Sequence, residues 1–119
     1  MNIEELRSFY LSLPYVTESF PFGEEHLVVK VGSKVFAIIS LLSEESCISL
    51  KCDPERAVEL RVRYDSIVPG YHLNKQHWNT VYLRRELPDS LLRELVQHSY
   101  DLVWAKLTKR ERNALSAGA

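Results

Sequence analysis

The chain of 119 residues contains little glycine and little cysteine, and it has no long hydrophobic run. No segment approaches the roughly 20 apolar residues of a transmembrane helix, so we expect no membrane span. The N-terminus lacks both a basic start and an apolar core, so we expect no signal peptide. The four glycines form no glycine-rich phosphate loop, and no GxSxG nucleophile elbow is present. These absences make an enzyme the less favoured class of function, and we predict no catalytic residue.

The few cysteines and histidines do not form a metal-binding pattern. Cys47 and Cys52 lie five positions apart in a strand-like stretch, which places them on opposite faces. This spacing argues against a disulfide and against a CxxC motif. His72 and His77 are also five apart, whereas a zinc site needs three or four ligands. We therefore expect a reduced, cytoplasmic protein without a metal or other cofactor.

The charges are distributed unevenly along a chain of ordinary globular composition. The hydrophobic content of 45% fits a single domain over residues 1–119. The net charge is −1, but residues 61–85 contain five Lys or Arg and one Asp. A local cationic patch can bind an anionic partner, although the whole protein exerts no long-range attraction on one.

The first half of the chain predicts a helix, three strands and a second helix. Asn2 and Glu5 form a capping-box pattern at the start of a helix that Pro14 ends. Residues 26–31 and 34–41, separated by a two-residue turn, predict a β-hairpin. Its faces should be Leu27, Val29 and Val31 on one strand, and Val35, Ala37, Ile39 and Leu41 on the other. Residues 48–52 alternate as a third strand, and Asp53 with Pro54 predicts the next helix start.

The second half predicts two strands, at 67–68 and 78–84, followed by a long helix from about Pro88. Thr108 with Glu111 predicts the cap of a short final helix. This order is typical of an α+β domain, a two-layer α/β sandwich of the form α-β(3)-α-β(2)-α, with a mainly antiparallel sheet covered on one face by helices. We expect one core to include Val29, Val31, Ala37, Ile39, Leu50, Leu95, Leu102 and Val103.

The segment 69–81 (PGYHLNKQHWNTV) combines a turn dipeptide with many hydrogen-bonding side chains. One interpretation is a polar loop that Tyr71 and Trp78 attach to the core. The other is an anion-binding surface, where cations and donors contact phosphates and Trp78 stacks on a base. The residues that favour the second interpretation are His72, Asn74, Lys75, His77, Trp78 and Asn79, with Arg84 and Arg85 close behind.

Residues 30–37 (KVGSKVFA), 49–54 (SLKCDP), 69–81 and the pair Ser99-Tyr100 together resemble the MmcQ/YjbR-like family over nearly the whole chain. The resemblance implies the same α-β(3)-α-β(2)-α order, in a fold similar to CyaY-like (frataxin-like) and secretion-chaperone-like domains. It also implies DNA binding with a double-wing arrangement. The positions shared with the family are Lys51, Pro69, Gly70, Tyr71, His72, Asn74, Lys75, His77, Trp78, Asn79, Ser99 and Tyr100.

The leading hypothesis is a non-enzymatic DNA-binding domain that contacts phosphates through the loop 69–81 and nearby basic residues. The alternative is a protein-interaction or chaperone-like module that uses one sheet face, and a small-molecule-binding or enzymatic domain ranks below both. We expect no membrane partner, and the sequence identifies no protein partner. The candidate nucleic-acid or anion-binding residues are Lys51, His72, Asn74, Lys75, His77, Trp78, Asn79, Arg84 and Arg85.

Overall fold

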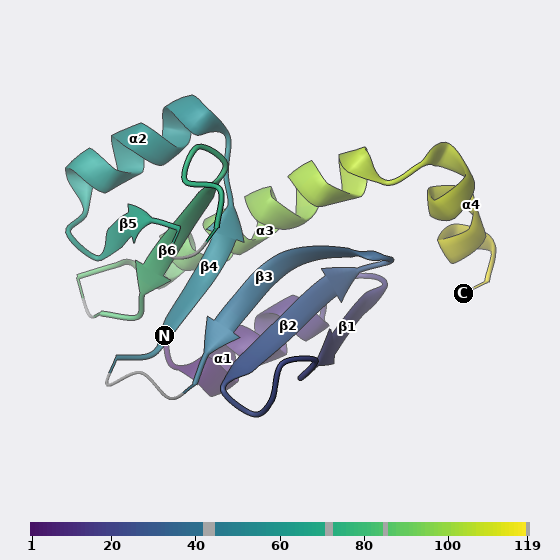
Figure 1. The fold of residues 1–119 in the computed structure, drawn as a ribbon, viewed down its shortest axis with the longest axis horizontal. Helices are drawn as coiled ribbons and strands as arrows, with labels where there is room; N and C mark the ends of the chain where they lie inside the picture. The colour runs from purple at the N-terminus through teal and green to yellow at the C-terminus, as the bar shows by residue number, and fades with distance from the viewer. Residues whose placement is uncertain (42–44, 71–72, 85, 119) are drawn as a thin grey trace.

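The protein is an α+β domain with four helices and a six-stranded sheet in the part that its computed structural model describes, residues 1–41, 45–70, 73–84 and 86–118 (Figure 1). The elements in chain order are α1 (Ile3–Leu11), β1 (Val16–Ser19), β2 (His26–Val31), β3 (Lys34–Ser40), β4 (Cys47–Lys51), α2 (Pro54–Arg63), β5 (Ile67–Pro69), β6 (Trp78–Tyr82), α3 (Asp89–Lys106) and α4 (Lys109–Ala117). No helix in the described ranges is long and apolar enough to cross a membrane.

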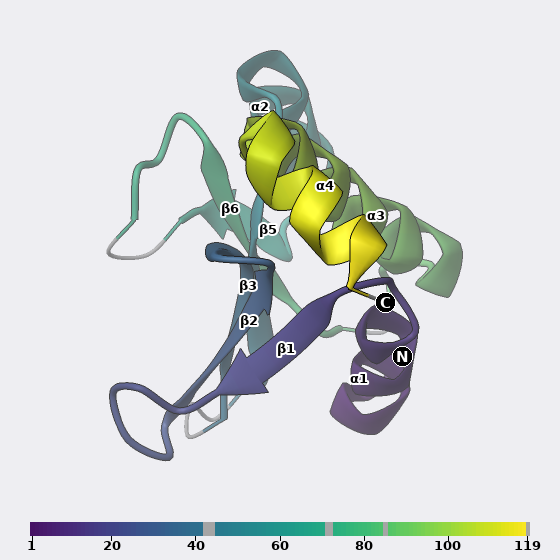
Figure 2. The same cartoon turned by 90° about the vertical axis from the view of Figure 1, so that its right-hand side faces the viewer.

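The strands form one sheet in the order β1-β2-β3-β4-β6-β5, and every neighbouring pair is antiparallel. Figure 2 shows the helices on one side of this sheet, while loops project from the other side. The predicted two-layer architecture is therefore confirmed. The predicted order of strands did not include β1, which pairs with β2 from Val16 opposite Val31. A four-residue edge strand is too short to show a clear alternation of apolar and polar residues.

The predicted helix starts are confirmed by their capping contacts. The Asn2 side chain accepts a hydrogen bond from the N–H of Glu5, whose carboxylate accepts one from the N–H of Asn2. Asp53 precedes α2 and accepts from the N–H of Arg56. Thr108 accepts from the N–H of Glu111 at the start of α4. Each cap satisfies a backbone donor that the helix itself leaves unpaired.

The core lies between the sheet and the helices, and it contains all but one of the residues predicted for it. The exception is Leu102, which is only half-buried, and that prediction was wrong. Tyr100 is buried in its place, with its ring edge-to-face against Phe36 and its hydroxyl donating to the carbonyl of Pro14 at 2.6 Å. The stripe of α3 that faces the sheet is thus rotated towards Tyr100.

Val35 was predicted to share a face of the hairpin with Ala37, and this prediction was wrong because β3 contains a β-bulge. Val29 pairs with Ala37 and Lys30 pairs with Val35, so Phe36 is an extra residue on β3. The bulge buries Phe36 completely and leaves Val35 half-buried opposite Lys30, on the other face from Ala37.

Ser99 of α3 fills the gap in the ladder that follows this bulge. Its hydroxyl donates to the carbonyl of Phe36 at 2.6 Å and accepts from the N–H of Lys51 at 2.9 Å. Ser99 is fully buried, so these bonds satisfy two backbone groups that would otherwise be buried without partners. The Ser99-Tyr100 pair therefore attaches α3 to the sheet and to the turn that follows α1.

Candidate functional site

Asn74 accepts several of the hydrogen bonds that hold the described part of the loop between β5 and β6. The carbonyl of Asn74 accepts from the N–H groups of His77 and Trp78, at 3.2 and 2.9 Å. Its side-chain oxygen accepts from the N–H of Gln76 at 2.9 Å. Asparagine commonly stabilises turns through such side-chain contacts to the backbone. Asn74 therefore shapes the loop, even though its side chain is exposed.

Gly70 allows the two ends of this loop to approach closely. Its N–H donates to the carbonyl of Trp78 at 2.8 Å. A β-carbon at position 70 would lie 2.7 Å from the β-carbon of Trp78, closer than van der Waals contact permits. The Pro69-Gly70 dipeptide is thus explained by backbone packing rather than by a ligand.

Asn79 is a buried structural residue that connects the loop to α2. Its side-chain oxygen accepts from Nε of Arg61 at 2.6 Å, and its amide nitrogen donates to the carbonyl of Ala57 at 3.3 Å. The same guanidinium also donates to the carbonyl of Lys75. Only 2% of Asn79 is exposed, so its amide serves internal bonds and is inaccessible to a ligand. Arg61 likewise stabilises the loop.

Three of the remaining candidates lie at one end of the uncovered sheet face. Lys51 pairs with Trp78 across β4 and β6, and both side chains are half-buried. Lys75 is exposed on the adjoining loop. His77 is half-buried, and its backbone carbonyl accepts a hydrogen bond from the N–H of Cys52. Among the described residues, neither Lys51 nor Lys75 takes part in an ion pair. We call Lys51, Lys75 and Trp78 the cationic end.

Arg84 does not belong to this group. It follows the opposite end of β6, where its guanidinium forms an ion pair with Glu45 at 2.8 Å. His72 and Arg85, together with Tyr71, lie outside the described residues. The nine candidate residues therefore do not form one surface in the part of the chain that the structure describes.

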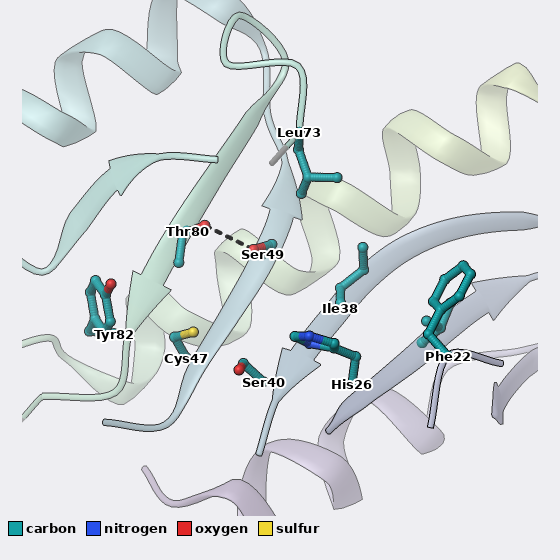
Figure 3. Close-up of a pocket in the computed structure, with 10 residues that line it drawn as sticks. Phe22, His26, Ile38, Ser40, Cys47, Ser49, Leu73, Thr80 and Tyr82 are labelled. Atoms are coloured by element: carbon teal, nitrogen blue, oxygen red, sulfur yellow. Dashed lines mark hydrogen bonds between the residues drawn. The ribbon is translucent and has the colours of Figure 1, made fainter. Parts of the chain in front are cut away.

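A pocket of about 500 Å³ opens on the uncovered sheet face (Figure 3). It adjoins the cationic end, because the pair Ser49 and Thr80 in its lining is two positions from the pair Lys51 and Trp78. Val28, Ile38, Ser49 and Thr80 form its floor, and the Ser49 and Thr80 hydroxyls are 2.9 Å apart in a hydrogen bond. At the far end it is lined by His26, Ser40, Cys47 and Tyr82, and two loops contribute Phe22 and Leu73.

None of the residues that line this pocket is among the nine candidates predicted from the sequence. Alternation along β4 and β6 would have placed Cys47, Ser49, Thr80 and Tyr82 together on the face opposite the core. Phe22 gave no such signal, because it lies in the loop between β1 and β2 and reaches the pocket only through the tertiary fold. Within the described ranges, no three His, Cys, Asp or Glu side chains are grouped closely enough to hold a metal ion.

The fold and this face define a small α+β domain whose sheet is covered by helices on one side and carries a pocket on the other. The chain belongs to the YjbR family, whose model matches residues 11–102. The resemblance to the MmcQ/YjbR-like family is thereby confirmed.

Similar proteins cover almost the whole chain. YbdF of Escherichia coli is 40% identical over 97% of this chain and 94% of its own length. YjbR of Escherichia coli is 35% identical over 97% and 98%, respectively. The crystal structure of DR2400 from Deinococcus radiodurans, a DUF419 domain, has a TM-score of 0.90 with 45% identity, covering 97% of this chain and 88% of that one. A Pseudomonas syringae protein at 24% identity, with a TM-score of 0.75 over 86% and 98%, shares the fold.

Proposed function

We propose that the protein is a non-enzymatic nucleic-acid-binding domain, for DNA in the first instance, that contacts phosphates with its cationic end. The observation that supports this most is the placement of Lys75. A loop that Asn74, Gly70 and Arg61 hold in shape presents this ammonium group to solvent, and the loop leads into Trp78, which pairs with Lys51. A positioned cation loses less conformational freedom on binding than one on a mobile loop.

The structure narrows the residues that this proposal uses. Asn79 and Asn74 act within the protein, and Arg84 is paired with Glu45 away from the loop. The phosphate contacts then reduce to Lys51 and Lys75, with His77 as an additional donor. Phosphate contacts by two lysines give weak, sequence-independent binding, with an expected Kd of about 10⁻⁴ to 10⁻⁶ M.

The test is a salt titration of Lys75→Ala against labelled oligonucleotides. Two released counterions give a log–log slope of about −1.4 for a single strand and about −1.8 for a duplex. Lys75→Ala should reduce the magnitude of this slope by about one contact and weaken binding equally for different sequences. Lys109→Ala is the matched control, because it removes the same charge from an exposed site on α4, far from the loop (Figure 1).

Failure to bind either a single strand or a duplex below about 100 µM at low salt would refute the proposal, since non-specific sites reach that range. Such a result would favour the alternative, a protein-interaction module that uses the open sheet face. We further infer a cytoplasmic location. Cys52 is in the core and Cys47 is on the open face, so no disulfide joins them.

A further inference from the structure

The pocket beside the cationic end suits an uncharged, partly apolar group. Among the described residues, its lining contains no Asp, Glu, Lys or Arg side chain. Its apolar surface comes from Val28, Ile38 and the two loop residues, and hydroxyl groups on neighbouring strands supply hydrogen-bond donors and acceptors. A volume of about 500 Å³ lies within the range of roughly 300–1,000 Å³ that small-molecule sites occupy.

The two ends of the open sheet face carry side chains of opposite charge. Lys51 and Lys75 lie at the end where β4 finishes and β6 begins. Glu24 and Glu25 precede β2, so these carboxylates lie at the opposite end, where Arg84 compensates the charge of Glu45. A ligand in the pocket can therefore place an anionic group near Lys51 and Lys75, where the attraction is strongest. The same group would be repelled by Glu24 and Glu25 at the opposite end.

An aromatic ring at the mouth of the pocket is available for stacking. Phe22 is 80% exposed and lines the pocket, although burial of such a side chain would normally be favourable. An aromatic ring, an uncharged pocket and cations at one end are the features with which proteins bind the bases and phosphates of a single strand.

We propose that this pocket holds one unpaired nucleobase, with Phe22 stacked on it and the adjoining phosphates at Lys51 and Lys75, so that the ligand is single-stranded nucleic acid. This inference rests on the proposed function, which it makes more specific. A base has two apolar faces and a hydrogen-bonding edge, which match the floor of the pocket and its hydroxyl groups. A base within a duplex is stacked and paired, so it cannot enter without the duplex opening.

The experiment compares three labelled probes of about eight nucleotides by fluorescence anisotropy: an oligothymidylate, an abasic strand of the same length and a blunt duplex. The oligothymidylate should bind at least about tenfold more tightly than the other two, because it alone supplies an unpaired base. Phe22→Ala should weaken its binding about 5- to 150-fold, the range expected for one lost stacking contact, and leave the abasic strand unaffected.

Phe20→Ala is the matched control. Phe20 is on the same loop and is 48% exposed, but it does not line the pocket, so its removal should leave the oligothymidylate affinity unchanged. Equal binding of all three probes, or no effect of Phe22→Ala, would overturn the base pocket and leave the phosphate contacts standing. Absence of binding by every probe would overturn both proposals together.

Discussion

Replacing Asn79 by alanine tests whether the polar residues of the segment 69–81 stabilise the protein rather than contact a ligand. The side chain is buried between β6 and α2, where it accepts a hydrogen bond from the Arg61 guanidinium and donates one to the carbonyl of Ala57. Alanine removes both bonds, and it leaves Nε of the half-buried Arg61 without its acceptor. We therefore expect the folded state to lose stability.

The two bonds set the magnitude. A hydrogen bond to a charged group contributes about 1.5–3 kcal/mol and a neutral one about 0.5–1.5 kcal/mol, so Asn79→Ala should cost about 2–4.5 kcal/mol. In a chain of 119 residues this corresponds to a fall in Tm of roughly 8–18 °C. The same change at Asn113 on α4, which is exposed and makes no side-chain hydrogen bond within the described part of the chain, should lower stability by less than about 0.5 kcal/mol.

Urea denaturation of the wild type, Asn79→Ala, Arg61→Ala and the double variant forms a double-mutant cycle. The coupling energy between the two residues should be about 1.5–3 kcal/mol, because either single change removes the charged hydrogen bond. A cost below about 0.5 kcal/mol for Asn79→Ala, or single effects that simply add, would refute this structural role and return Asn79 to the candidate ligand contacts.

Two further predictions concern the core and the response to pH. Leu92→Ala should lower the free energy of unfolding by about 2–5 kcal/mol because Leu92 is almost fully buried. Leu102→Ala should lower it by less than half as much because Leu102 is only half-buried, and chemical denaturation of both variants measures the difference. Burial, with a smaller contribution from the charge of Arg56, lowers the pKa of His98, whose neutral Nε2 accepts from the N–H of Asp53. The unfolded chain therefore binds a proton more readily than the folded one, so this contribution to stability is present above about pH 6.5 and declines as pH falls below it. His98→Gln should flatten that decline in urea titrations at pH 7.5 and 5, and an unchanged slope, or an equal change in the exposed control His26→Gln, would contradict the assignment.

Local signals determined most of the fold. The Asn2, Asp53 and Thr108 caps, the Gly32-Ser33 turn and the presence of a long helix that ends at Lys106 depend on residues within a few positions of one another, so the sequence predicts them correctly. The family resemblance, carried by contiguous motifs, was confirmed for the same reason. Features that depend on neighbours in space were less visible: a bulge at Phe36 turned Val35 to the other face.

The tertiary structure alone decided which candidate residues lie together. Asn79 was predicted to contact a ligand. In the folded chain its side-chain oxygen instead accepts a hydrogen bond from Arg61, which lies eighteen positions earlier on α2. Arg84 is near Lys75 in sequence, yet β6 separates them and Glu45 pairs with Arg84. The pocket likewise depends on side chains of neighbouring strands and on two loops, one carrying Phe22 and the other Leu73. Composition and periodicity report the faces of single elements, whereas a binding surface requires distances between elements that only the packed chain specifies.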